Sequence, residues 1–266
     1  MKKTKILIIL MVGFMWTQAF AGLEAENILK QINNSMASGL VALNIDYKEF
    51  VDDPNFKSTE AGTMAGLFLN ARIAPWEKLY ADLYLDFLAG TLKYDGAYAT
   101  PPYAPLVKDF AHIFFNTILK VGPLFNLGDR YSLQAIPYVG IGYRYWHRQS
   151  NNFYSEKYHH GKALVGIKLN CLLTDDFVLS PYVEVGKMFG AHMEYVATGV
   201  DHKLGNKPIY GAGLELNYKM ADDLFLNGFV NYTQFKYGKS ALATDGSYEP
   251  DSKTREIKLG IGVRYM

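Results

Sequence analysis

The sequence has almost no cysteine and no charge excess, and each shortage excludes a class of protein. Cys171 is the one cysteine among 266 residues, so the chain can form no internal disulfide and offers no cysteine-based metal site. The 27 Lys and Arg residues balance the 26 Asp and Glu residues, which leaves no bulk charge to attract nucleic acid. Beyond residue 21, no apolar run approaches the roughly 18 residues of a membrane-spanning helix. We therefore expect no nucleic-acid partner, no metal, no cofactor and no transmembrane helix.

The N-terminus is the exception to this shortage of apolar runs. Three lysines within the first five residues precede an apolar stretch from Ile6 to Trp16. A small-x-small cleavage motif ends at Ala21, and the next residue is Gly22 rather than the cysteine of a lipoprotein. The pattern predicts an export signal peptide over 1–21, with a short membrane anchor as the alternative. The mature chain then begins in an exported compartment.

Residues 22–38 form a separate segment that we expect in the periplasm. Ile28, Leu29, Ile32 and Met36 keep a helical spacing, which indicates a short amphipathic helix or tether. A disordered leader is the alternative interpretation.

The remainder of the chain has the composition of long strands and turns. It supplies most of the 20 tyrosines and 24 glycines, residues typical of strands and turns respectively. Successive side chains of a strand point to opposite faces, so a strand with one apolar face alternates with a period of two. Ten segments show this alternation: 39–50, 58–72, 79–93, 109–125, 131–147, 160–173, 177–193, 208–220, 224–237 and 254–265.

The stretch "IPYVGIGYRYWHR" at 136–148 shows the pattern most clearly, and "SPYVEVGKMFGAHM" at 180–193 nearly repeats it. In the first stretch, Val139, Ile141 and Tyr143 share one face, while Gly140 and Arg144 share the other. A soluble sandwich also alternates, with its polar face in water. The alternation therefore predicts strands but does not decide between these two folds.

The first segment predicts which of its side chains point toward lipid and which point into the lumen. The apolar face of 39–50 carries Val41, Leu43, Ile45 and Tyr47, and the opposite face carries Asp46 with its polar neighbours. If apolar faces meet lipid, those four side chains point outward and Asp46 points inward.

The connections between the segments differ in length by side. Brief turns follow the even-numbered segments, at 74–78, 126–130, 174–176 and 221–223. Mostly longer loops follow the odd-numbered segments, at 51–57, 94–108, 148–159, 194–207 and 238–253. Short turns on one rim and long loops on the other are the layout of an outer-membrane barrel, and a sandwich has no reason to sort its loops in this way.

Aromatic residues gather near the ends of the segments, as in the two belts of a membrane barrel. The expected belt at the short-turn rim contains Trp76, Tyr80, Tyr218 and Tyr265. The expected belt at the other rim contains Tyr143, Tyr145, Tyr232 and Tyr237.

The charges fall on the face opposite the apolar one, and a charge in lipid costs several kcal/mol. The sequence therefore predicts an all-β fold over 39–266: a ten-stranded antiparallel transmembrane β-barrel, with eight strands as the alternative. The predicted lumen charge network comprises Asp46, Asp82, Asp86, Arg144, Lys168, Glu184, Glu215, Lys258 and Arg264. We interpret it as a salt-bridged plug, because side chains nearly fill small barrels; a selective pore is the alternative.

The last strand ends in "KLGIGVRYM", and its Lys258, Gly260, Val263 and Tyr265 fit the signal that outer-membrane barrels present to the barrel assembly machinery. Met266 follows the aromatic residue, whereas the family usually ends on it. Together with "FNLGDRYSLQAIPYVGIGYRYW", this chain resembles the small outer-membrane β-barrel proteins of Gram-negative bacteria. The resemblance implies a multi-pass barrel in the outer membrane, and it implies location more than activity. The even number of strands then predicts that both termini lie in the periplasm.

Ten strands also suggest the omptin proteases, which place an Asp-x-Asp pair and an Asp-x-His pair above the barrel. Asp82 and Asp86 are separated by three residues, and Asp201 and His202 are adjacent, so neither spacing matches. We transfer no catalytic residue and expect the protein not to be an enzyme.

Two cations, Lys236 and Arg255, have outward parity near the long-loop rim. They form a hypothetical lipopolysaccharide contact through charge-assisted hydrogen bonds to phosphate, and ordinary snorkelling is the alternative. The leading hypothesis is a structural or interaction role for the extracellular loops, among which 94–108 is rich in Pro and Tyr. The alternatives are a narrow channel for small solutes and, behind it, an outer-membrane protease or lipid-modifying enzyme.

Overall fold

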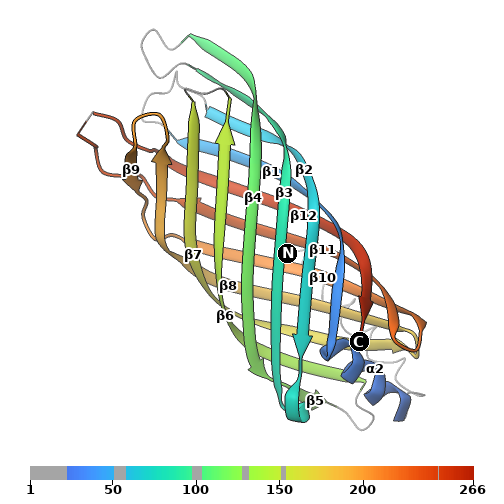
Figure 1. Cartoon of the computed structure of the whole chain (residues 1–266). Coiled ribbons are helices and arrows are strands. Elements are labelled where there is room, and N and C mark those ends of the chain that lie inside the picture. The colour runs from blue at the N-terminus through green and yellow to red at the C-terminus, as the bar shows by residue number, and fades with distance from the viewer. Residues whose placement is uncertain (1–22, 51–57, 98–103, 128–131, 151–153, 245) are drawn as a thin grey trace, which may run out of the picture.

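The fold is that of a computed structural model, and it shows one barrel of long, tilted strands (Figure 1). The structure describes residues 23–50, 58–97, 104–127, 132–150, 154–244 and 246–266. The predicted signal peptide, 1–21, lies outside these residues.

Ten long antiparallel strands form the wall, and two short strands pair near its ends. The long strands are β1 (Ser35–Phe50), β2 (Ser58–Ile73), β3 (Leu79–Ala97), β4 (Pro105–Pro123), β6 (Leu133–Gln149), β7 (Ser155–Thr174), β8 (Phe177–Tyr195), β10 (Pro208–Ala221), β11 (Leu224–Tyr237) and β12 (Asp251–Tyr265). The short strands are β5 (Phe125–Leu127), which pairs with β6, and β9 (Val200–Lys203), which pairs with β8.

Each long strand pairs with the next one along the chain, and the last pairs with the first. The register between β1 and β12 runs from Met36 opposite Tyr265 to Phe50 opposite Asp251. This pairing leaves no free edge, which is the condition for a sheet to span a membrane. The predicted ten-stranded antiparallel barrel is confirmed.

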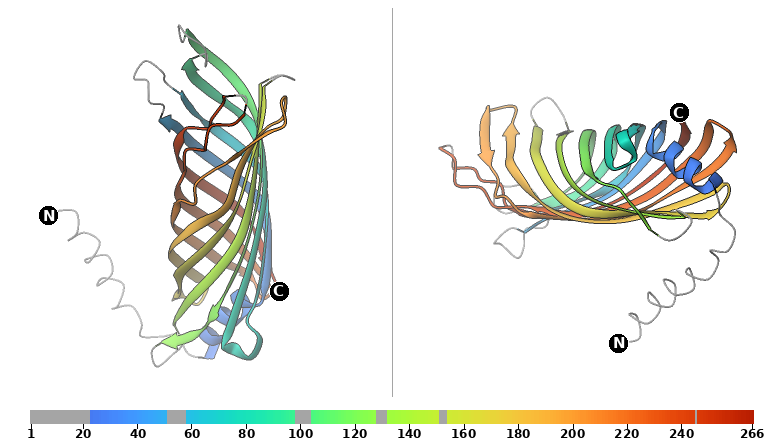
Figure 2. Two further views of the ribbon diagram at one scale, coloured as in Figure 1. Left: turned by 90° about the vertical axis from the view of Figure 1, so that its left-hand side faces the viewer. Right: turned by 90° about the horizontal axis from the view of Figure 1, so that it is seen from below.

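The chain before the barrel forms a helix, α2 (Leu23–Asn33), which contains Ile28, Leu29 and Ile32 of the predicted helical spacing, whereas Met36 lies in β1. The first strand begins at Ser35, four residues before the predicted boundary at 39, because inward-facing Ser35 and Ala37 already continue its alternation. Among the described residues, no helix is long and apolar enough to cross a membrane. We call the end of the barrel that holds α2 and the C-terminus the helix end, and the opposite end the loop end (Figures 1 and 2).

The strands are longer than a bilayer requires. They contain from 14 residues in β10 to 20 in β7, whereas about 9–11 tilted residues span the hydrocarbon core. Residues 94–97 and 105–108 of the predicted loop 94–108 therefore belong to the hairpin of β3 and β4. Residues 98–103 of that loop lie outside the described residues. At the helix end, the turns at 74–78, 175–176 and 222–223 are brief, and 74–78 contains the 3-10 turn η2 (Pro75–Glu77).

The outer surface is apolar around the middle of the barrel, as expected for β2 to β12. Leu67, Phe87, Val139, Val183 and Ile261 point outward from five different strands and are among the most exposed side chains of the wall. The alternate residues of the same strands, including glycines and charges, point into the lumen. The outer face thus has the chemistry of lipid contact and the inner face has the chemistry of a polar core.

Strand β1 departs from this rule, and the prediction for its direction is wrong. Val41, Leu43, Ile45 and Tyr47 are at most 3% exposed and point inward, while Asp46 points outward. The physical reason is that the loop-end half of the lumen is filled by a hydrophobic cluster that these four side chains join. Asp46 is therefore not part of the lumen charge network.

The aromatic belts are also smaller than predicted. Tyr80 and Tyr237 are buried and point into the lumen rather than toward the surface. The other residues of the two predicted belts lie on the outside or in the turn: Trp76, Tyr143, Tyr145, Tyr218, Tyr232 and Tyr265.

Candidate functional site

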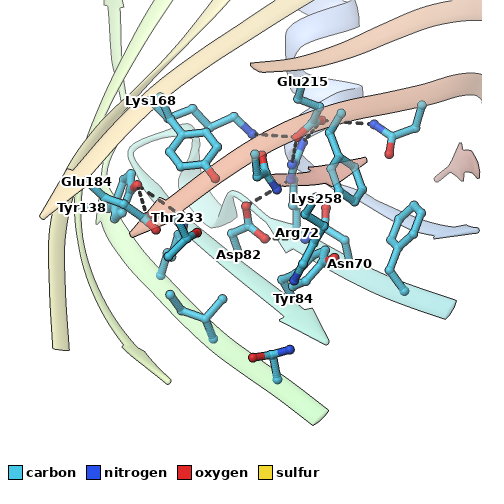
Figure 3. A pocket seen from close by; sticks show the side chains of 18 of the residues that line it. Asn70, Arg72, Asp82, Tyr84, Tyr138, Lys168, Glu184, Glu215, Thr233 and Lys258 are labelled. Atoms are coloured by element: carbon cyan, nitrogen blue, oxygen red, sulfur yellow. Dashed lines mark hydrogen bonds and ion pairs between the residues drawn. The ribbon is translucent and has the colours of Figure 1, made fainter. Parts of the chain in front are cut away.

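The polar lumen is organised around Glu215, which β10 points into the helix-end half of the barrel. Its carboxylate accepts a hydrogen bond from Arg72 Nη1 at 2.8 Å, and Arg72 Nη2 contacts its second oxygen. Lys168 Nζ lies at 3.4 Å and Arg264 Nη2 at 3.2 Å from the same carboxylate. Three cations from β2, β7 and β12 therefore converge on one largely buried anion (Figure 3).

Asp82 on β3 is the second anion of this layer. It accepts hydrogen bonds from Tyr80 Oη at 2.8 Å and Arg72 Nε at 3.3 Å, and Asn70 also donates to it. Asn70 in turn accepts from Arg264 Nη2 at 2.9 Å. The layer is thus a continuous network across the barrel, which holds its strands together from the inside.

A second layer of charges lies closer to the middle of the barrel. Asp86 contacts Lys258 and accepts from Asn116 Nδ2 at 2.5 Å, and Asn116 Oδ1 accepts from Arg144 Nε at 2.6 Å. Arg144 then donates to Glu256 at 2.9 Å.

Glu184 on β8 belongs to the same layer. Lys120 Nζ and Tyr138 Oη each donate to it at 2.7 Å. Eight of the nine predicted lumen residues therefore lie in these networks, and Asp46 is the exception.

The lumen also contains cations that the predicted list omits: Arg72, which belongs to the first network, and Lys162, which lines the cavity described below. Arg72 has the same parity as Asn70, and Lys162 has the same parity as Lys168, so extending the alternation along each strand would have found both. Glu256 likewise shares the parity of Lys258.

A cavity of about 130 Å³ lies between the two charged layers (Figure 3). Glycines on the lumen face of the wall create part of this space. A Cβ added to Gly142 would lie 2.8 Å from Lys162 Cε, and one added to Gly211 would lie 2.8 Å from Glu184 Cγ. The glycines of the "PYVGIGYRYW" stretch therefore leave room for long charged side chains inside a narrow barrel.

Above the cavity, toward the loop end, an aromatic layer crosses the lumen. Trp146 is fully buried, and its ring centroid lies 4.9 Å from that of Tyr158, 5.1 Å from Phe114 and 5.3 Å from Tyr47. Its indole nitrogen donates to His112 Nδ1 at 2.8 Å. His112 therefore carries its proton on Nε2, which lies 2.9 Å from Glu60 Oε1.

Beyond the aromatic layer, several carboxylates surround a single arginine. Arg148 Nε lies 3.1 Å from Glu156 Oε2 and 3.7 Å from Glu60 Oε2, and Arg148 Nη1 lies 3.6 Å from Glu49 Oε1. Glu249 reaches the same cluster from the segment 238–250 and accepts from Tyr158 Oη at 2.7 Å. Burial and the adjacent carboxylates of Glu49 and Glu156 hold the pKa of Glu249 well above its ordinary range.

At the helix end, α2 packs into the mouth of the barrel. Ile28, Leu29 and Ile32 are buried against the inward-facing side chains of Leu172, Val178 and Phe225. Asn33 at the end of α2 donates to Gln134 at 2.8 Å and accepts from Asn170 at 3.1 Å. The cavity thus has α2 on one side and the aromatic layer on the other.

The two cations predicted to contact lipopolysaccharide do point outward near the loop end. Arg255 lies 3.6 Å from Asp46, so it already has a carboxylate partner. Lys236 instead belongs to a lysine row that the sequence did not reveal. Lys253 stands directly opposite both Lys236 on β11 and Lys48 on β1, and all three point outward.

The assembly-signal residues are divided between the two faces of β12. Lys258 and Gly260 face the lumen, whereas Val263 and Tyr265 face outward. Within the described part of the chain, no group of three or more His, Cys, Asp or Glu side chains is arranged to hold a metal ion.

The closed antiparallel barrel, with charges inside and an apolar outer band, defines the class: the chain has the fold of the small outer-membrane β-barrel proteins. No protein-family model and no curated protein matches the sequence. Among solved structures, it is similar to the outer-membrane protease OmpT from Escherichia coli, with a TM-score of 0.54 and 8% identity over 87% of this chain and 95% of that chain.

Two further solved structures match less closely. The transport unit of the autotransporter AIDA-I from Escherichia coli has a TM-score of 0.47 and 12% identity, covering 94% of this chain and 100% of that one. The outer-membrane protein OprG from Pseudomonas aeruginosa has a TM-score of 0.38 and 13% identity, covering 87% and 93%. Identities this low show the fold alone.

The residues weighed against the omptin pattern have separate partners in the structure. Asp82 and Asp86 lie inside the barrel, as predicted. Asp201 pairs with His192 at 3.0 Å, while His202 is buried near Ser240. Asp201 and His202 thus have different partners.

Proposed function

We propose that this protein is a non-enzymatic outer-membrane barrel whose closed lumen makes it a rigid support for an extracellular interaction surface. The observation that carries the proposal is the filling of the lumen at four levels: α2, the two charged layers and the aromatic layer around Trp146. A barrel filled in this way gains stability from its interior and leaves its external rim available for contacts.

The proposal includes an orientation. The helix end faces the periplasm and the loop end faces the outside, because short turns lie on the periplasmic side in bacterial barrels. Both termini are then periplasmic, and the terminal pattern of Lys258, Gly260, Val263 and Tyr265 suits delivery by the barrel assembly machinery.

Conductance across a planar bilayer tests the closed lumen. We expect the purified protein to give no reproducible unit steps, because α2 and the aromatic layer lie on either side of the cavity. The runner-up, a narrow channel for small solutes, is favoured by the cavity itself and requires such steps. A known open porin in the same bilayer establishes that steps are detectable.

Lipopolysaccharide is the partner that we propose for the outer face, together with the surrounding lipid. Lys48, Lys253 and Lys236 form a row on three adjacent strands, and like charges directly opposite one another are unfavourable without a counter-anion. Among the described residues, Lys253 and Lys236 have no carboxylate partner. A glycolipid phosphate would neutralise the row while its acyl chains cover the apolar band.

We expect the triple variant Lys48→Gln, Lys253→Gln and Lys236→Gln to bind lipopolysaccharide at least tenfold more weakly, since each lysine near an anionic surface contributes about 1 kcal/mol. Binding is measured with the detergent-solubilised barrel and labelled lipopolysaccharide. The matched control replaces three outward lysines on other strands, Lys93, Lys157 and Lys187, with Gln. It therefore has the same net charge as the test variant. Equal weakening in both variants would show a bulk charge effect and refute a site at the row.

A further inference from the structure

The charges that line the cavity do not balance. Six cations line it: Arg72, Lys120, Lys162, Lys168, Lys258 and Arg264. Four carboxylates line it: Asp82, Glu184, Glu215 and Glu256. Each of these carboxylates already has a cation in contact, and Glu215 has three. The cavity wall therefore carries a surplus of positive charge.

Among the described residues, no carboxylate contacts Lys162 on β7, which is one of the six lining cations. Its stem lies over Gly142 on the neighbouring strand, and its side chain is among those that line the cavity. Its charged neighbours are the cations Arg144 and Lys258 and the carboxylates of Glu184 and Asp86. Each of these four groups already pairs with another residue. An enclosed charge without a partner is costly, so this arrangement favours an additional negative charge beside Lys162.

We propose that the cavity is a binding site for a small inorganic anion, such as a halide, with Lys162 as its principal ligand. The cavity's 130 Å³ far exceeds the roughly 10–15 Å³ that one water molecule requires, so it can hold an ion with part of its hydration shell. Asn116, Thr233 and Asn231 also line the cavity and supply polar groups for that shell.

The size of the anion follows from the surroundings of the cavity. Helix α2 packs into one end of the barrel, and the ring of Trp146 with its aromatic neighbours crosses the lumen on the other side. Organic anions and sugar phosphates are too large to pass such filled layers, whereas a halide can enter during small side-chain motions. The inference rests on the proposed closed lumen and names a ligand for it.

The experiment uses the full mature barrel in a neutral detergent, with bromide as the probe and gluconate at equal ionic strength as the reference. We expect bromide to raise Tm saturably by at least about 3 °C over gluconate. Lys162→Met, which keeps an unbranched side chain one atom shorter and removes its charge, should abolish this difference. Lys187→Met is the matched control, because Lys187 points outward from β8 and should leave the bromide response unchanged.

Crystals soaked in bromide give an independent measurement that does not depend on stability. We expect an anomalous peak beside Lys162 Nζ in the wild type and none there in Lys162→Met. A wild type whose Tm is the same in bromide and gluconate, or a Lys162→Met variant that responds as the wild type does, would overturn the proposal. Unit conductance steps would instead refute the closed lumen, so the two failures are distinguishable.

Discussion

Glu215→Gln is expected to destabilise the barrel by about 3–5 kcal/mol, the typical cost of removing one member of a buried ion pair. The substitution keeps the shape of the side chain and removes the negative charge on which Arg72, Lys168 and Arg264 converge. Asp82 then remains as the carboxylate in contact with Arg72, and the other two cations lose theirs. Urea titration of the barrel refolded into lipid vesicles measures the change in the free energy of unfolding.

Two further variants separate this effect from a general loss of charge. Glu194→Gln removes a carboxylate from a partly exposed pair with Lys157 and should change the free energy of unfolding by less than about 1 kcal/mol. Adding Lys168→Met to Glu215→Gln removes one of the stranded cations, so the double variant should be more stable than the sum of the two single changes predicts. A Glu215→Gln barrel as stable as the wild type would contradict the role assigned to the network.

The second large effect is expected at the aromatic layer. Trp146→Ala removes a fully buried ring that stacks on Phe114 and Tyr158, and it leaves His112 Nδ1 without its donor. Large-to-small changes of this kind cost about 3–5 kcal/mol. The same urea titration measures it, together with the temperature at which the folded band disappears in heat-modifiable gel mobility.

The matched control is Trp76→Ala in the turn between β2 and β3. Trp76 is 82% exposed, so removing its ring creates no cavity. Trp76→Ala should therefore lower the free energy of unfolding by well under half as much as Trp146→Ala does. If Trp146→Ala and Trp76→Ala lowered the free energy of unfolding equally, packing in the aromatic layer would not stabilise the barrel.

The alternation of side chains predicted most of the barrel, because a strand between lipid and a polar lumen must separate its residues by face. It predicted that Asp82, Asp86, Glu184 and Glu215 lie inside, and they do. It failed for β1 because the lumen is not polar throughout. Where the interior becomes aromatic, an apolar side chain no longer indicates the lipid face.

Contacts that depend on three-dimensional distance could not be predicted from the sequence. Glu249 reaches Tyr158 and the carboxylates near Arg148 from a segment outside any strand, so its parity carries no information. The lysine row likewise depends on the register of β12 with both neighbours, which aligns Lys253 with Lys48 and Lys236. A one-residue shift of that register would have separated them.

The central claim is that lipid surrounds the middle of the barrel while its loop end stands in water, and spin labels at two positions of β1 test it most directly. Leu40 and Asp46 both point outward from the same strand, and Leu40 is 64% exposed on the apolar band. In reconstituted vesicles, a label at Leu40 should collide with oxygen dissolved in the lipid, and a label at Asp46 should collide with a water-soluble nickel complex. A water-exposed label at Leu40 would contradict the membrane barrel itself.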